Sequence, residues 1–209
     1  MFKTLKNAIK TPDIRKRILY TLLLIVIFRL GCFITVPGIN LVVLDEVMTE
    51  VSGGLGGLIN LISGGAFSRL SLFAMSINPY ITASIVIQLL AMVIPALEVL
   101  AKEGGEEGKE KMNKYTKLLT IVLAIVEAVG LYFTYRNSGI FVDTGFLTAV
   151  IFMLSLVAGT AILMWLGEQI TSKGVGNGIS MIIFAGIIAG LPSAVTALYR
   201  LIILNGVFS

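Results

Sequence analysis

The sequence contains no histidine and a single cysteine, Cys32, among its 209 residues. The lack of histidine excludes imidazole acid–base chemistry and histidine-based zinc sites. A lone cysteine cannot form an internal disulfide, so nothing indicates a disulfide-stabilised fold. Charged residues make up only 13% of the chain, whereas soluble domains usually have about 25%. The composition therefore argues against a soluble globular protein.

Apolar residues take the place of the missing charges. Hydrophobic residues account for 56% of the chain, and the mean hydropathy is +0.96. We expect an all-α polytopic membrane protein, because several apolar runs approach the roughly 20 residues that a helix needs to cross the hydrocarbon core. The five expected spanning helices are residues 18–36, 76–97, 118–135, 146–166 and 179–204.

The basic residues gather on one side of these helices. Six of the 16 lysines and arginines fall in the N-terminal segment 1–17, five in the loop 98–117 and one in the loop 167–178. Loops rich in lysine and arginine usually stay in the cytoplasm, so we expect these segments to be cytoplasmic. A basic segment before an apolar run is also typical of a signal peptide. The run extends to residue 36, which favours a retained first helix.

An apolar stretch at residues 53–67 is interrupted by glycines on both sides. Its apolar centre, residues 55–62, would rise only about 12 Å as a helix, far less than a membrane crossing requires. Irregular backbone at this depth is tolerated only inside protein or along a watery cavity. We therefore expect a re-entrant half-helix beside a pathway through the protein.

Two glycine-rich segments resemble nucleotide-binding loops only superficially. Residues 104–110 lack the first glycine and the Ser/Thr of a phosphate-binding loop, so we interpret the loop 98–117 as a solvated hairpin. Residues 174–178 lack the third glycine and the preceding strand of a dinucleotide site. They are either a flexible connection between helices or a loop shaped for a cytoplasmic partner. Neither segment predicts a nucleotide site.

The second expected helix is unusually polar for a membrane span. Asn78 and Thr82 share one face, as do Ser84 and Gln88, because residues four apart lie above each other on a helix. Such side chains either hold helices together or line water. Glu127 lies near the middle of the third expected helix, where burying a carboxylate in the membrane costs free energy. It either couples proton movement or hydrogen-bonds to a neighbouring helix.

Two long blocks of the sequence are specific enough to indicate a family. Residues 63–90 read SGGAFSRLSLFAMSINPYITASIVIQLL, and residues 164–192 read MWLGEQITSKGVGNGISMIIFAGIIAGLP. Together with ITVPGIN at 34–40 and KYT at 114–116, these blocks resemble the SecY family, the channel subunits of the bacterial Sec translocon. The resemblance implies ten spanning helices in two inverted halves that close like a clamshell around a pore. The five helices expected here would form the N-terminal half.

The resemblance also implies roles for individual residues. The segment 53–67 matches the family's plug, with the plug residues Leu55, Leu58, Ile59, Leu61, Ile62 and Phe67. The positions of the pore ring are matched by Ile77, Ile81, Ile179 and Ile183. Ile77 and Ile81 are four residues apart, as are Ile179 and Ile183, so the two side chains of each pair lie on the same face of a helix. The second and third helices match one wall of the lateral gate, which includes Asn78, Thr82 and Gln88.

The implied function is a protein-conducting channel in the bacterial plasma membrane. Such a channel translocates unfolded secretory proteins and releases membrane proteins sideways into lipid. Its implied partners are SecE, SecG, the SecA ATPase or the ribosome, nascent chains with signal sequences, membrane lipid and the C-terminal half of the channel. No bond is made or broken, so the resemblance implies neither an enzyme nor a cofactor or metal.

Two other interpretations remain open. An ion-coupled secondary transporter of small solutes also uses broken helices near the membrane centre. Such a transporter should direct polar or charged groups at a compact site, whereas the constriction expected here consists of isoleucines. The third interpretation is an assembly module that does not transport on its own.

Overall fold

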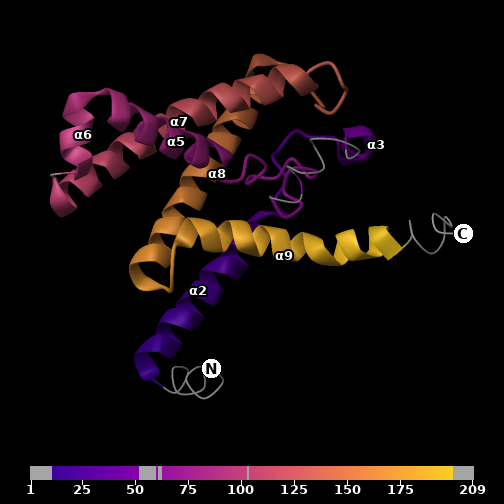
Figure 1. The fold of residues 1–209 in the computed structure, drawn as a ribbon. Helices are drawn as coiled ribbons and strands as arrows, with labels where there is room; N and C mark the ends of the chain where they lie inside the picture. The colour runs from indigo at the N-terminus through magenta and orange to yellow at the C-terminus, as the bar shows by residue number, and fades with distance from the viewer. Residues whose placement is uncertain (1–10, 52–59, 61–62, 103, 200–209) are drawn as a thin grey trace, which may run out of the picture.

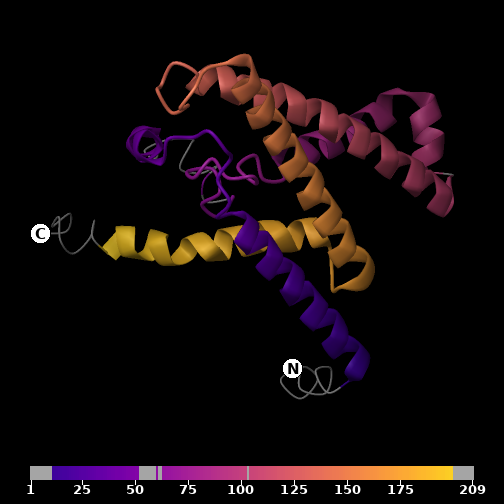
Figure 2. The ribbon, with the colours of Figure 1, turned by 180° about the vertical axis from the view of Figure 1, so that it is seen from behind.

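The computed structural model of this chain describes residues 11–51, 60, 63–102 and 104–199. Within these residues the regular elements are helices, joined by irregular segments that form two isolated β-bridges. Figures 1 and 2 show α5 beside α7, α8 crossing from α7 to α9, and α2 meeting α8 and α9. The helices are α2 (Pro12–Gly31), α3 (Leu41–Val51), α5 (Asn78–Val93), α6 (Pro95–Lys102), α7 (Gly105–Tyr135), α8 (Phe146–Lys173) and α9 (Gly178–Tyr199).

Two of these helices, α7 and α8, are long and apolar enough to cross a membrane on their own. The pair α5 and α6 would provide a third span, but the chain bends by 106° between them. The apolar part of α9, Gly178–Pro192, is shorter. The described residues therefore form an all-helical fold with two or three membrane-capable helices, and the count of five spans stays a prediction.

The expected solvated hairpin at residues 98–117 is wrong in its local structure. Residues 98–102 belong to α6, and α7 begins at Gly105 and runs for 31 residues. Ion pairs four residues apart stabilise both helices: Lys102 Nζ lies 2.6 Å from Glu98 Oε1, and Lys111 Nζ lies 3.0 Å from Glu107 Oε1. The segment lacks apolar periodicity because these parts of the helices are solvated.

The first helix begins and ends earlier than expected. α2 begins at Pro12, and proline is favoured in the first turn of a helix; it ends at Gly31 instead of residue 36. A Cβ at Gly31 would lie 2.1 Å from the ring of Phe73, so the chain after α2 is packed directly against another segment. The following acidic stretch forms an additional helix, α3, which the sequence did not predict.

The second and fourth expected helices also have different ends. α5 ends at Val93 because Pro95 forces the preceding Ile94 into an extended conformation. α8 continues past residue 166 to Lys173. The loop expected at residues 167–178 is therefore reduced to the connection 174–177 between α8 and α9.

Residues 63–77 form a buried irregular segment between α3 and α5. Its backbone pairs with the chain after α2: Val36 N–H donates to Leu70 O at 3.1 Å, and Leu72 N–H donates to Ile34 O at 2.8 Å. Leu70 and Ser76 have left-handed φ values of 38° and 53°, an uncommon conformation for residues with a side chain. These turns keep backbone groups paired within the protein, as buried non-helical backbone in a membrane requires.

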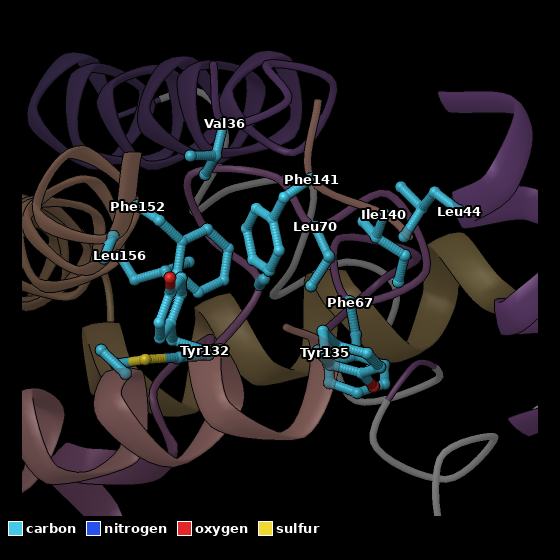
Figure 3. Packing of buried hydrophobic residues seen from close by; sticks show 14 of the residues in the cluster. Val36, Leu44, Phe67, Leu70, Tyr132, Tyr135, Ile140, Phe141, Phe152 and Leu156 are labelled. Carbon is cyan, nitrogen blue, oxygen red and sulfur yellow. The ribbon is translucent and has the colours of Figure 1, made fainter. Parts of the chain in front are cut away.

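Among the described residues, the larger of two buried apolar clusters contains five aromatic side chains, and we call it the aromatic cluster (Figure 3). The rings of Phe141 and Phe152 meet edge to face with centroids 5.1 Å apart, and Tyr132 lies 5.3 Å from Phe141. Phe67 and Leu70 bring the irregular segment into the same cluster. This cluster joins α7, α8 and the irregular segments into one unit.

The second cluster lies where α2, α8 and α9 meet. Phe28 of α2 packs against Phe73 with ring centroids 6.0 Å apart, and Leu163 and Ile170 of α8 are fully buried beside them. A Cβ at Gly159 would lie only 1.8 Å from Leu72 O, so glycine allows α8 to touch the irregular backbone. The irregular segment thus passes through both clusters.

The connection between α8 and α9 is tied to α2. Thr21 is buried, donates its hydroxyl hydrogen to Arg17 O at 2.9 Å and accepts one from Val175 N–H at 3.0 Å. Thr171 Oγ1 accepts a hydrogen bond from Gly178 N–H at 2.8 Å. The segment 174–178, which the sequence left as flexible or partner-binding, is held by these contacts.

We expect Gly159→Ala to lower the free energy of unfolding by about 1–3 kcal/mol, because the added methyl overlaps the Leu72 carbonyl and forces two backbones apart. Gly130→Ala is the matched control, since a Cβ at this helical glycine meets nothing within 4 Å and alanine favours helices. Thermal unfolding in detergent measures both. Equal stability of the two variants would contradict the close approach.

We expect Thr21→Val to cost about 0.5–1.5 kcal/mol, because Val175 N–H loses its acceptor in a partly buried setting. Thr21→Ser keeps the hydroxyl and serves as control. Hydrogen exchange followed by mass spectrometry should show faster exchange at residues 174–177 in the valine variant only. Unchanged exchange there would mean that the hydroxyl does not hold the connection.

Candidate functional site

The four isoleucines expected to form a constriction all pack on the second apolar cluster. Ile77 is a buried member of the cluster, and Ile81, Ile179 and Ile183 are half-buried against it. Ile77 lies just before α5, and its carbonyl accepts a hydrogen bond from Ile81 N–H at 3.0 Å, so the helical spacing of this pair holds. Side chains from the start of α5 and from the start of α9, which are far apart in the sequence, thus pack on the same cluster.

The start of α9 is fixed by an N-cap and by contact with α8. Asn177 Oδ1 accepts hydrogen bonds from Ile179 N–H at 3.0 Å and from Ser180 N–H at 3.3 Å, which satisfies amides that a helix start leaves unpaired. A Cβ at Gly178 would lie 1.9 Å from Gly167 O. Two glycines therefore bring α8 and α9 into backbone contact, and this contact positions Ile179.

A polar cavity of about 670 Å³ lies beside the isoleucines, between α5, α7, α8 and α9. Ile81 and Ile179 line one part of it. The rest of the wall includes further apolar groups, from Ile85 and Met164, together with hydroxyl and amide groups and one ion pair, in which Lys117 Nζ lies 2.5 Å from Glu168 Oε1. We call this space the polar cavity. Apolar side chains on its wall lie next to groups that can hydrogen-bond water.

The three residues assigned to the lateral gate occupy different surroundings. Asn78 lines a second cavity, of about 360 Å³, whose wall also includes Glu127 of α7. Gln88 donates a hydrogen bond to Ser84 at 3.1 Å, which confirms that these two residues share a face of α5. Thr82 is exposed. The structure therefore does not gather the three side chains into one site.

Sequence reasoning missed the shared cavity of Asn78 and Glu127. Phe67, Thr134 and Met75 complete much of its wall, so a carboxylate and an amide lie in mostly apolar surroundings. The sequence contained a signal, because both polar residues lie within apolar runs. It could not show that α5 and α7 pack side by side and bring them to the same place.

The expected plug lies mostly outside the described residues, including Leu55, Leu58, Ile59, Leu61 and Ile62. The expectation of a half-helix up to residue 67 is wrong at its end: residues 63–67 form turns, and Phe67 is buried in the aromatic cluster. The Arg29 guanidinium donates a hydrogen bond to Gly64 O, and Ser68 N–H donates to Asn60 Oδ1 at 3.0 Å. The Arg29 contact ties the end of the segment to α2, and the Ser68–Asn60 hydrogen bond stabilises the turns themselves.

Metal-binding residues do not converge in the part of the chain that the structure describes. No group of three or more cysteine, aspartate or glutamate side chains lies close enough there to hold an ion. The chemistry that the site offers is therefore hydration, hydrogen bonding and one ion pair beside a cluster of isoleucines.

Comparison of the sequence with known proteins gives consistent matches. The SecY family profile matches residues 71–209. Protein translocase subunit SecY of Buchnera aphidicola subsp. Acyrthosiphon pisum is 45% identical over 198 residues, which are 93% of this chain and 45% of that relative. The Bacillus subtilis protein of the same name is 46% identical over 204 residues, 96% of this chain and 46% of the relative. The chain thus spans about half the length of these relatives.

Two solved structures share the fold of this chain. The chain superimposes with a TM-score of 0.58 on Sec61 in the canine ribosome-channel complex from the endoplasmic reticulum, at 23% identity and over 83% of this chain and 36% of Sec61. A structure described as a protein conducting channel gives the same values. At this identity the likeness shows the fold, and the sequence matches show the family. The chain belongs to the SecY family.

Proposed function

We propose that this chain is the N-terminal part of a protein-conducting channel that passes unfolded polypeptides across a membrane. The observation that carries the proposal is the meeting of Ile77, Ile81, Ile179 and Ile183 on one apolar cluster beside the polar cavity. Relatives of known name, such as the Bacillus subtilis protein, are protein translocase subunits. In the full channel, the second half would complete the ring around the path.

The isoleucines would act as a seal by their lack of polarity. A narrow ring of branched apolar side chains excludes water, and ions cannot cross a dry constriction cheaply. The same side chains offer no hydrogen bonds that would hold a passing polypeptide. The polar cavity next to them would keep the entering chain hydrated until it reaches the ring. No covalent bond changes in this process, so the proposed function is not enzymatic.

Two further parts of the proposal concern gating. The packed pair α5 and α7 would form one wall of the lateral gate, with Asn78, Thr82 and Gln88 on α5. Polar residues on this wall tolerate a change of neighbour between closed and open states, because they can exchange partners with water. Residues 53–67 would act as the plug, held at its end by the contact of Arg29 with Gly64.

The proposed surroundings follow from the family and from the charges. We propose the bacterial plasma membrane, with the basic segment 1–17 in the cytoplasm. The proposed partners are SecE, SecG, membrane lipid, the C-terminal half of the channel, and SecA or the ribosome as motor. Secretory and membrane proteins with signal sequences would be the substrates.

A secondary transporter is the second candidate, and the cavity that holds Asn78 and Glu127 favours it. A carboxylate among apolar residues in a membrane helix is a typical proton-coupling group. The family match and the apolar character of the four isoleucines favour the channel. Titration of one carboxylate would be essential in a transporter and dispensable in a channel.

We expect Ile81→Asn and Ile183→Asn to raise the ion conductance of the full-length channel several-fold, because an amide in the ring hydrates the constriction. Ile188→Asn is the control, since Ile188 lies exposed on the same helix as Ile183. Planar-bilayer recordings at zero protein translocation measure the leak. Equal conductance in ring and control variants would exclude these isoleucines from the seal.

We expect Glu127→Gln to leave the translocation of a secretory protein unchanged, because a channel needs no proton carrier at this position. The variant keeps the approximate size of the side chain and one acceptor oxygen, but its amide cannot gain or lose a proton as a carboxyl group does. Translocation into proteoliposomes and proton flux are measured on the same preparation. Loss of substrate movement together with loss of proton flux would support the transporter instead.

A further inference from the structure

Lys117 and Glu168 are the charged residues among those that line the polar cavity. Lys117 comes from α7 and Glu168 from α8, and their Nζ and Oε1 atoms lie 2.5 Å apart. Glu168 Oε1 is shielded from solvent, and among the described residues it has the ion pair with Lys117 but no contact that meets the geometry of a hydrogen bond. The contact between the two side chains is therefore an ion pair in which one carboxylate oxygen is shielded from solvent.

The other polar groups on the cavity wall carry no charge. They are the side chains of Tyr80, Ser84, Asn113, Thr171, Ser172, Asn177 and Ser180. A cavity with low-dielectric walls focuses the field of any unpaired charge inside it. The pairing of Lys117 with Glu168 cancels the net charge of the part of the wall that the described residues form.

The pair is poorly suited to a purely stabilising role. The side chains of Lys117 and Glu168 are 38% and 36% exposed, and ion pairs with this exposure contribute little to stability. The fold has stronger ties between α7 and α8, in the aromatic cluster that contains Tyr132 and Phe152. A role in setting the electrostatic potential of the cavity explains the position of the pair better.

We propose that the Lys117–Glu168 pair determines substrate range by keeping the polar cavity electrically neutral, so that acidic and basic segments of a passing polypeptide cross it equally well. This inference rests on the proposed function as a protein-conducting channel. Ile81 and Ile179 on the same wall place the pair next to the proposed seal, where each segment must lose water. An uncompensated charge there would repel segments of the same sign and retain segments of the opposite sign.

The test uses the full-length channel in proteoliposomes with its motor and two secretory substrates. The substrates differ only in a mid-chain segment that carries either lysines or glutamates. We measure the ratio of their translocation rates. Glu168→Gln leaves Lys117 unpaired and should lower the rate for the lysine-containing substrate about three- to tenfold relative to the rate for the glutamate-containing substrate. Lys117→Gln leaves Glu168 unpaired and should shift the ratio of the two rates in the opposite direction. Higher ionic strength should reduce both changes.

Two double variants separate neutrality from a mechanical tie between the helices. Lys117→Gln with Glu168→Gln removes the pair and keeps the wall neutral, and Lys117→Glu with Glu168→Lys reverses it. Both should give the wild-type ratio. A shifted ratio in the double-glutamine variant, or shifts of the same sign in both single variants, would overturn the inference. Equal ratios in all variants would overturn it too, and leave the proposed function intact. Failure of the unmodified channel to translocate either substrate would overturn both.

Discussion

The arrangement of this protein depends on one constraint, which is that irregular backbone buried among membrane-capable helices must find its hydrogen-bond partners inside the protein. The segment 63–77 meets this requirement by pairing with residues 34–36 after α2 and by turns of its own. Gly159 allows α8 to approach the segment at Leu72. Because the segment passes through both apolar clusters, its path determines where α5 begins.

The placement of the candidate site follows from that path. Ile77 is the last residue before α5, so the irregular segment delivers it directly to the second cluster. From the other direction, the N-cap Asn177 and the contact of Gly178 with Gly167 bring α9 to the same cluster. Two segments about a hundred residues apart thus present isoleucines to one place, beside a cavity with a polar wall. This division between apolar and polar surfaces is what a hydrated path with a dry constriction requires.

Charge is scarce in this chain, and the structure shows the surroundings of several charged residues in the part of the chain that it describes. Glu98, Lys102, Glu107 and Lys111 pair along solvated parts of α6 and α7. Lys117 and Glu168 join two helices at the wall of the polar cavity. Glu127 shares a separate cavity with Asn78. The Lys117–Glu168 pair compensates the charges on the wall of the polar cavity, and this compensation is consistent with the proposed conduit for polypeptides of varied sequence.

The sequence by itself determined the class of the protein, because composition and apolar run length limit a chain to helices in a membrane, and the blocks at 63–90 and 164–192 indicated the family that the comparisons show. It also predicted the i,i+4 faces of α5, since helical geometry is local. The sequence did not predict the helices at residues 98–117, because helices stabilised by charge pairs carry no apolar periodicity. It also placed the end of the first helix at residue 36, whereas α2 ends at Gly31. Only the tertiary structure decided which polar residues share a cavity and which isoleucines share a cluster, because these contacts depend on how the irregular segment is packed between helices that are distant in the sequence.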